Sequence, residues 1–271
     1  MLRSFCLKNP ALSDYPKLKA LWQTSFDDAD IALDNFFNKT VSPQNTLCIE
    51  HNGEIVSALY MLECDYISQH KVYSAYYIYG VCTHPQYRGM GLMHKLFEGL
   101  KEQAEKDCVD FLFLVPAEKY LFDVYKKEGF QKAVFYTEKT VNKNDFPCGE
   151  NEIPQVFSYS LYREYNEKCF VGYPLMLLKK QAFESFFYPA TDEIKIITVR
   201  GKGYAVTDGK TVFELCGDKD SLLKRIFYET GAETLTLRVM PEKDNSIDYG
   251  MIYSVKGELA DGCFFGVPYS V

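Results

Sequence analysis

The chain has 271 residues, of which 47% are hydrophobic and 25% are charged, a composition typical of globular proteins that bury a sizeable core. Acidic residues outnumber basic residues 37 to 30, and the resulting net charge of −7 argues against a nucleic acid or an anionic membrane as the main partner. The length predicts one large domain or two ordinary ones.

The nine cysteines are scattered along the chain, and none belongs to a Cys-x-x-Cys pair. The sequence therefore predicts neither a zinc site nor a disulfide framework, and no metal is implied. Such thiols are typical of a reducing cytoplasm. No signal-like apolar segment follows Met1, and no apolar run is long enough to span a bilayer. We therefore expect a soluble cytoplasmic protein.

The first part of the chain alternates short strands and helices. The predicted elements are a strand, two helices and the two strands of a hairpin, at residues 1–8, 11–22, 30–37, 45–50 and 55–66. The hairpin is predicted because Asn52-Gly53 between two apolar runs is a strong turn signal. A turn at 69–71 leads into a long strand, which should end at His84-Pro85 because proline has no N–H for a strand ladder.

The segment that follows combines a strand end, a glycine-containing turn and the start of a helix. The turn is Gly89-Met90-Gly91, and one stripe of the helix after it is apolar, at Leu92, Leu96, Leu100 and Ala104. The first N–H groups of a helix lack intrahelical partners and carry partial positive charge. The glycines allow close approach to the backbone, and Arg88 adds a permanent charge. This pattern predicts a phosphate or pyrophosphate site; the alternative is a β-α turn that is merely rich in glycine.

The next elements complete the first half of the chain. The apolar run 110–115 predicts a fully buried strand, and a helix over 118–128 should end at Gly129 in the left-handed cap conformation. A strand over 130–141 follows. Tyr125 lies near the end of the predicted helix.

Two segments resemble one known family. Gln86-Tyr87-Arg88-Gly89-Met90-Gly91 resembles the Q/R-x-x-G-x-G/A motif of the GNAT superfamily of acetyl-CoA-dependent N-acetyltransferases, and it follows a strand and opens a helix as in that family. The segment from Tyr125 to Phe130 resembles the family's Y-x-x-x-G-F ending. The resemblance implies direct transfer of an acetyl group from acetyl-CoA, as co-substrate, to a primary amine.

The resemblance also implies roles for individual residues. The pyrophosphate would be bound by Arg88, Gly89, Met90, Gly91, Leu92, Met93 and His94, and the pantetheine arm by the backbone of Val81, Cys82 and Thr83. Tyr125 would protonate the departing thiolate, because a phenol with a pKa of about 10 stays protonated at working pH. A buried structural tyrosine is the alternative for this residue. Cys82 is expected to be an incidental thiol, since direct transfer needs no acyl-enzyme.

The sequence does not identify the general base. Many members of the family carry a glutamate on the strand where this chain has tyrosines at 76, 77 and 79. Glu63, Glu118 and the terminal carboxylate of Val271 are the candidates that remain. Tyr120 is a candidate for the lining of the cofactor cleft.

The second half of the chain looks like a faded repeat of the first. After a predicted linker come two helices, three short strands, a helix and a strand, at residues 157–170, 174–188, 194–200, 203–207, 211–216, 220–229 and 234–240. The junction that corresponds to the phosphate motif is Cys216-Gly217-Asp218-Lys219. It has no arginine, and Asp218 would repel a phosphate. The second copy is therefore not expected to bind CoA.

We predict an α/β (α+β) fold with two GNAT-like domains, each a mostly antiparallel mixed sheet flanked by helices. Residues 1–141 would be the catalytic domain, 142–155 a linker and 156–271 a degenerate domain. The arrangement resembles tandem proteins of the enhanced-intracellular-survival (Eis) type, without room for their third, sterol-carrier-like domain. The expected acceptor is a small-molecule or peptide amine, with neither nucleic acid nor membrane as partner. The alternatives are a non-catalytic acyl-CoA-binding or sensor protein and an acyltransferase that uses another acyl-CoA.

Overall fold

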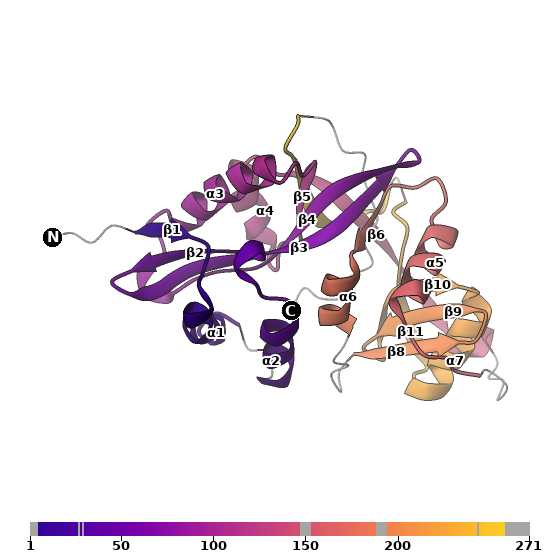
Figure 1. Ribbon diagram of the computed structural model, residues 1–271. Helices are drawn as coiled ribbons and strands as arrows, with labels where there is room; N and C mark the ends of the chain where they lie inside the picture. Colours follow the sequence, from indigo (N-terminus) through magenta and orange to yellow (C-terminus); the bar gives the residue numbers. More distant parts are fainter. Residues whose placement is uncertain are drawn as a thin grey trace.

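The computed structural model describes residues 5–26, 28, 30–146, 153–187, 194–242 and 244–257. These residues form a twelve-stranded sheet with helices on both sides (Figure 1), which confirms the predicted α/β class. The strands are β1 (Cys6–Lys8), β2 (Thr46–His51), β3 (Glu54–Ser68), β4 (Lys71–Thr83), β5 (Phe111–Leu114), β6 (Gln131–Asn142), β7 (Leu175–Leu178), β8 (Lys195–Val199), β9 (Gly203–Thr207), β10 (Thr211–Gly217), β11 (Thr234–Val239) and β12 (Ile247–Ser254).

Seven α-helices are found in the described part of the chain. They are α1 (Tyr15–Gln23), α2 (Asp30–Lys39), α3 (Leu92–Lys106), α4 (Lys119–Lys127), α5 (Tyr159–Cys169), α6 (Lys180–Phe187) and α7 (Lys219–Thr230). Within these residues, no helix combines the length and the apolar character needed to cross a bilayer.

The order of the strands shows two similar halves, 5–146 and 153–257. Along the sheet the order is β1-β2-β3-β4-β5-β12-β6-β11-β10-β9-β8, and β7 pairs with β3. Among the strands of the described residues, only the β4–β5 and β10–β11 pairs are parallel, and one α-helix joins the strands of each pair: α3 in the first half and α7 in the second. The meander, helix and strand of the second half thus repeat those of the first, in the order that the sequence predicts.

The sheet of the first half is completed by a strand from the second half. β12 lies between β5 and β6, with Met251 opposite Leu114 and Ile247 opposite Tyr136. β6 then continues past β12 to pair with β11, where Leu237 lies opposite Lys139. The division into 1–141, 142–155 and 156–271 stays a prediction, and one continuous sheet crosses it.

The two faces of the first-half sheet are covered by different helices, because successive side chains of a strand point to opposite faces. Figure 1 shows α3 and α4 on one side and α1 and α2 on the other. Leu96 and Phe97 of α3 belong to one buried cluster with Ile78 of β4, whereas Trp22 of α1 belongs to another with Tyr77.

The prediction of a helix over 174–188 is wrong at its start. Residues 175–178 form β7, which pairs antiparallel with β3 (Cys64 opposite Leu178), and α6 begins only at Lys180. All four residues of β7 are buried. A short apolar run of this kind does not distinguish a strand from a helix by periodicity. The pairing is decided by the edge of β3, which β2 covers only as far as Tyr60.

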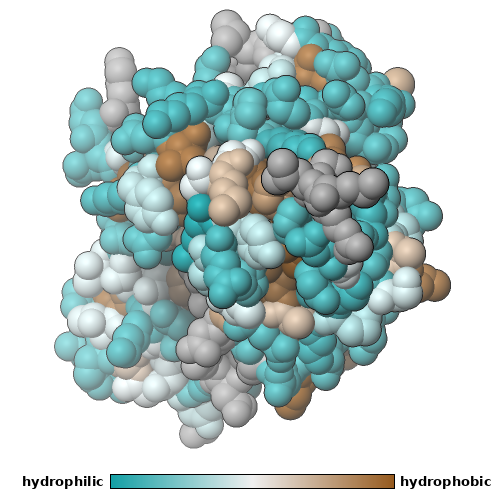
Figure 2. All heavy atoms as spheres, turned by 90° about the vertical axis from the view of Figure 1, so that its left-hand side faces the viewer, coloured by the Kyte–Doolittle hydropathy of each residue, from teal (hydrophilic) through white to brown (hydrophobic). Residues whose placement is uncertain are grey.

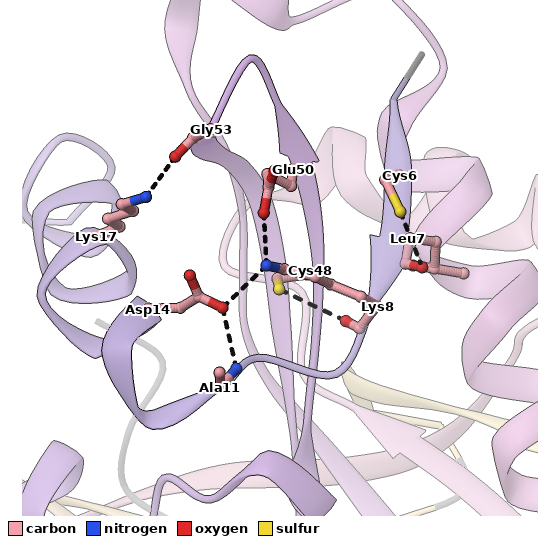
Figure 3. Close-up of polar contacts among 9 residues, drawn as sticks. All are labelled: Cys6, Leu7, Lys8, Ala11, Asp14, Lys17, Cys48, Glu50 and Gly53. Atoms are coloured by element: carbon pink, nitrogen blue, oxygen red, sulfur yellow. Dashed lines mark hydrogen bonds and ion pairs between the residues drawn. The ribbon is translucent and has the colours of Figure 1, made fainter. Parts of the chain in front are cut away.

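An ion-pair cluster fixes the edge of the sheet at β1. The Lys8 ammonium lies 2.9 Å from Asp14 Oδ2 and 2.5 Å from Glu50 Oε2 (Figure 3). Burial alone would raise the pKa of Asp14, but Lys8 and the Ala11 N–H, which donates to Oδ2 at 2.9 Å, together lower it. The Lys8 ammonium of β1 thus joins Glu50 of β2 to Asp14 in the turn before α1.

Candidate active site

The two central strands of the first half separate at one end. β4 pairs with β5 over four residue pairs, from Ala75 opposite Phe111 to Ile78 opposite Leu114. β5 then ends, and Pro116 cannot continue a ladder. Beyond this point the β4–β5 cleft opens, with a volume of about 130 Å3. Its lining comes from β4, the end of β5, α4 and the end of α1, at Trp22, Phe26, Asp28, Tyr77, Ile78, Tyr79, Gly80, Val81, Leu114, Val115, Ala117, Leu121 and Tyr125.

A bulge shapes the β4 side of the cleft. Tyr79 lies opposite Tyr60 and Cys82 opposite Ala58, so two residues of β4, Gly80 and Val81, face one residue of β3. Gly80 has a positive φ of 59°, and a Cβ at this position would overlap the ring of Trp22. Glycine is therefore required both by the backbone conformation and by the close approach of the indole.

The backbone of the last residues of β4 is divided between β3 and the open edge. The His84 N–H donates to Val56 O of β3 at 2.9 Å. Since backbone groups two residues apart in a strand face the same neighbour, those of Cys82 also face β3. The Thr83 carbonyl faces the other way and accepts from Arg88 Nε at 3.1 Å. Of the three residues predicted to bind the pantetheine arm, Cys82 is therefore the one whose backbone groups are least available to a ligand at the open edge of β4. Burial raises the pKa of its thiol to about 12, so it stays protonated.

The phosphate loop, Arg88 to Gly91, lies between β4 and α3. Gly89 and Gly91 have positive φ angles of 77° and 74°, and no atom of the described residues lies within 4 Å of where a Cβ would stand. Gly91 is the N-cap of α3, and it has no side chain to bind the N–H groups of the first turn. An open cradle with uncapped N–H groups fits a phosphate or diphosphate group.

The surface at the end of the molecule that carries β1 and β2 is mostly hydrophilic. Figure 2 shows this end with small, separate hydrophobic patches.

Three predicted site residues of the phosphate loop and α3 have apolar side chains. Met90 of the phosphate loop is exposed, whereas Leu92 at the start of α3 is buried and Met93 is half-buried. These three residues contribute backbone groups to the loop and the first turn rather than a charged side chain.

Tyr125 of α4 lies in both the core and the cleft. Its side chain packs against Phe97, with ring centroids 5.6 Å apart, and it is 7% exposed. Burial raises the pKa of its phenol to about 12, with a smaller contribution from Tyr120. The phenol is therefore fully protonated at neutral pH, and it is available to the cleft as a hydrogen-bond donor.

The two glutamates that are candidates for a general base lie away from the cleft. Glu63 is 63% exposed, lies 3.4 Å from Lys179 Nζ and lines a separate cavity of about 900 Å3 beside the edge of β3. Glu118 is an exposed residue at the start of α4 and is not among the described residues that line the cleft. Tyr120 is exposed as well. Val271 lies outside the described residues. The structure therefore brings neither glutamate to Tyr125.

The cleft contains a carboxylate that the sequence analysis missed. Asp28 lies between α1 and α2 and lines the cleft, and its Oδ2 accepts from Trp22 Nε1 at 2.6 Å. The acidic stretch 27–30 between two predicted helices was a visible signal, but it could equally have been a solvated surface. The structure alone shows that Asp28 lines the cleft, because its carboxylate binds the indole N–H of Trp22, which packs against β4.

We expect Gly80→Ala to be more destabilising than Gly53→Ala. Both glycines have positive φ, which costs an L-residue about 1–2 kcal/mol, but a Cβ at Gly53 meets no described atom within 4 Å. The clash with Trp22 should add about 1–3 kcal/mol at Gly80 alone. Urea unfolding of the two variants measures the difference. Equal losses of stability would show that the ring of Trp22 does not press on this position.

Comparisons with known proteins agree with this fold. Residues 7–133 match the family model of the acetyltransferase (GNAT) domain. The fold is similar to that of a GCN5-related N-acetyltransferase from Kribbella flavida, with a TM-score of 0.71, 14% identity and coverage of 93% of this chain and 71% of that one. A GCN5-related N-acetyltransferase from Anabaena variabilis gives a TM-score of 0.69, 15% identity and coverage of 93% of this chain and 73% of that one. The fold is also similar to that of Eis1 from Mycobacterium abscessus, with a TM-score of 0.64, 9% identity and coverage of 93% of this chain and 74% of that one. Among curated proteins no match to the sequence is found. At these identities the structures show likeness of fold alone, and the family model shows a match to a GNAT acetyltransferase domain over residues 7–133, a little under half of the chain.

Proposed function

We propose that the protein is an acetyl-CoA-dependent N-acetyltransferase that transfers an acetyl group directly to a primary amine. The observation that carries the proposal is the β4–β5 cleft, because a buried, protonated Tyr125 and the bulged end of β4 line the same small space. Its volume of about 130 Å3 favours a short acyl group over a long one.

The phosphate loop and the end of β4 would bind the co-substrate. The uncapped N–H groups of α3 and the guanidinium of Arg88 suit the diphosphate, and the two glycines leave room for it. The pantetheine arm would follow the open edge of β4 past Thr83 toward Val81, which lines the cleft. An N–H of the bulge would then donate to the thioester carbonyl as negative charge develops on its oxygen.

Asp28 and the aromatic residues beside it would bind the acceptor. A carboxylate together with the faces of Trp22 and Phe26 suits a protonated amine, which both groups attract. The neutral amine must form before attack, because an ammonium has no lone pair. Asp28 would hold the ammonium at the cleft until one proton passes to solvent, and the neutral amine would lose a second proton as the C–N bond forms.

Tyr125 would stabilise the sulfur as it leaves. In the overall transfer a C–N bond forms, the C–S bond breaks, and the proton released by the amine ends on the thiol. The pKa of a thiol is about 8.5, well below the value of about 12 for Tyr125. Full ionisation of Tyr125 is therefore uphill. We infer that its phenol donates a hydrogen bond that stabilises the departing thiolate while the proton is delivered.

We expect Tyr125→Phe to lower turnover by about 100-fold and to change acetyl-CoA affinity by less than about twofold, because the ring still fills its place beside Phe97. Thiol release in the presence of amine acceptors measures turnover, and calorimetry measures binding. An unchanged rate would reduce Tyr125 to a core residue. Binding of acetyl-CoA by the wild type, with no turnover for any amine, would favour the non-catalytic sensor instead.

Gly89→Glu should abolish the micromolar binding of acetyl-CoA that we expect of the wild type, since it fills the phosphate loop and adds negative charge. Gly172→Glu is the matched control: Gly172 also has positive φ, and no described atom lies within 4 Å of its Cβ position, but it belongs to the second half. Calorimetric titration of the three proteins tests the site. If Gly172→Glu weakens binding equally, the loss comes from strain and not from the cradle.

Asp28→Asn should raise the KM for a cationic amine by about tenfold and leave the KM for acetyl-CoA unchanged, because it removes the charge and keeps an oxygen for Trp22. Asp30→Asn serves as the control, since Asp30 is exposed and accepts from Gln23 Nε2 at 3.1 Å outside the cleft. Steady-state kinetics with an amine found in the screen would measure both. An acceptor KM that falls or stays the same would remove Asp28 from the acceptor site.

A further inference from the structure

A buried carboxylate stands behind the phosphate loop. Glu128 follows α4, three residues after Tyr125, and its side chain is only 7% exposed. Its Oε2 lies 2.9 Å from His94 Nδ1, and Oε1 lies 3.2 Å from the same nitrogen. The His94 side chain is 62% exposed. A buried carboxylate is costly unless it is paired, and here its described partner is a histidine at the surface.

The contact fixes the direction of the imidazole. Because both oxygens of Glu128 face Nδ1, this nitrogen carries the proton that is donated to the carboxylate. The other ring nitrogen, Nε2, takes no part in this contact, and the side chain as a whole is largely exposed. His94 is the third residue of α3, so it lies within the turn whose N–H groups face the proposed diphosphate.

Two electrostatic effects on the pKa of His94 oppose each other at this position. The N-terminal end of a helix disfavours a cation, which alone would lower the pKa of a histidine there. The hydrogen bond and the charge of Glu128 instead raise the pKa of His94, with a smaller contribution from Glu98 that Lys101 opposes. Among the described residues, the charged groups that act on His94 are therefore Glu128 after α4 and these two residues of α3.

We propose that Glu128 is a positioning residue that holds His94 as an oriented imidazolium, whose Nε2–H donates to the diphosphate of the co-substrate. This assignment rests on the proposed function, because it needs a CoA-type nucleotide at α3. A carboxylate that merely tied α4 to α3 would need no ionisable partner at the surface. The pair thus links the α4 element that carries Tyr125 to the element that binds the nucleotide.

The assignment fixes the sign of the pH dependence. His94 is charged below its pKa, which lies above the usual 6.5. Nucleotide affinity should therefore be full at lower pH and fall as the pH rises through that raised pKa. Without Glu128 the pKa drops, so the fall begins at a lower pH. Without an ionisable group at position 94 the dependence disappears.

The experiment is a calorimetric titration of dephospho-CoA between pH 5.5 and 9. This ligand lacks the 3′-phosphate, whose second ionisation near pH ~6 would otherwise mask the effect. Wild-type affinity should fall by about tenfold across the range, as expected when a charge-assisted hydrogen bond is lost. His94→Gln should have low, constant affinity, and Glu128→Gln should move the midpoint to lower pH. Glu105→Gln, which is also on the exposed face of α3 but is not among the groups that shift the pKa of His94, should resemble the wild type.

A second measurement separates this assignment from a structural role. The NMR titration of the imidazole C–H of His94, identified by its loss in His94→Gln, gives the pKa without ligand. If the wild type binds dephospho-CoA and the pH dependence survives in His94→Gln, or if Glu128→Gln leaves both the midpoint and the NMR pKa unmoved, the assignment is wrong while the proposed function stands. If the wild type binds no dephospho-CoA at any pH, the proposed function and the assignment both fall, and the NMR pKa then reports only a structural ion pair.

Discussion

The short parallel pairing of β4 with β5 is the constraint on which the candidate site depends. Four residue pairs hold the strands together, and the ladder ends where Pro116 removes a donor. Backbone groups need partners, so a strand edge that loses its neighbour must meet water, a side chain or a ligand. Arg88 satisfies the Thr83 carbonyl, and the bulge at Gly80 sets the direction of the residues before it. The end of the β4–β5 pairing thus accounts both for the cleft and for the backbone groups that line it.

The second half of the chain contributes to this arrangement without carrying the phosphate motif. β12 fills the place between β5 and β6, so the first half lacks one strand of its own sheet. Tyr253 of β12 packs against Phe130, with ring centroids 5.7 Å apart, and its ring lies 5.3 Å from Lys101 Nζ. It therefore supports the α3 and α4 side of the core, where Tyr125 and the pair of His94 with Glu128 lie. The second half thus supplies a strand that completes the sheet of the first half.

Local signals explain what the sequence predicted well. Asn52-Gly53, the glycines of the phosphate loop and Gly129 all have positive φ, so their residue types report the backbone directly. The failures are tertiary. β7 is a strand because β3 has a free edge, and β12 was missed although Tyr249, Met251 and Tyr253 alternate along it. The surroundings of Gly80 depend on the indole of Trp22, which is distant in sequence, and the same indole binds Asp28, whose place in the cleft local signals did not indicate.

Net charge is a poor guide to what this protein binds. A chain of net charge −7 would seem unsuited to an anionic nucleotide, yet charges at a surface are screened over about 8–10 Å at physiological salt. At that range the local groups decide. The phosphate loop combines the uncapped N–H groups of α3 with Arg88, and the exposed His94 stands one turn away. Glu128 and His94 together add no net charge, but the carboxylate is buried and it stabilises the positive charge of the exposed imidazole. A buried anion can in this way place a cationic donor at the surface beside a proposed anion site.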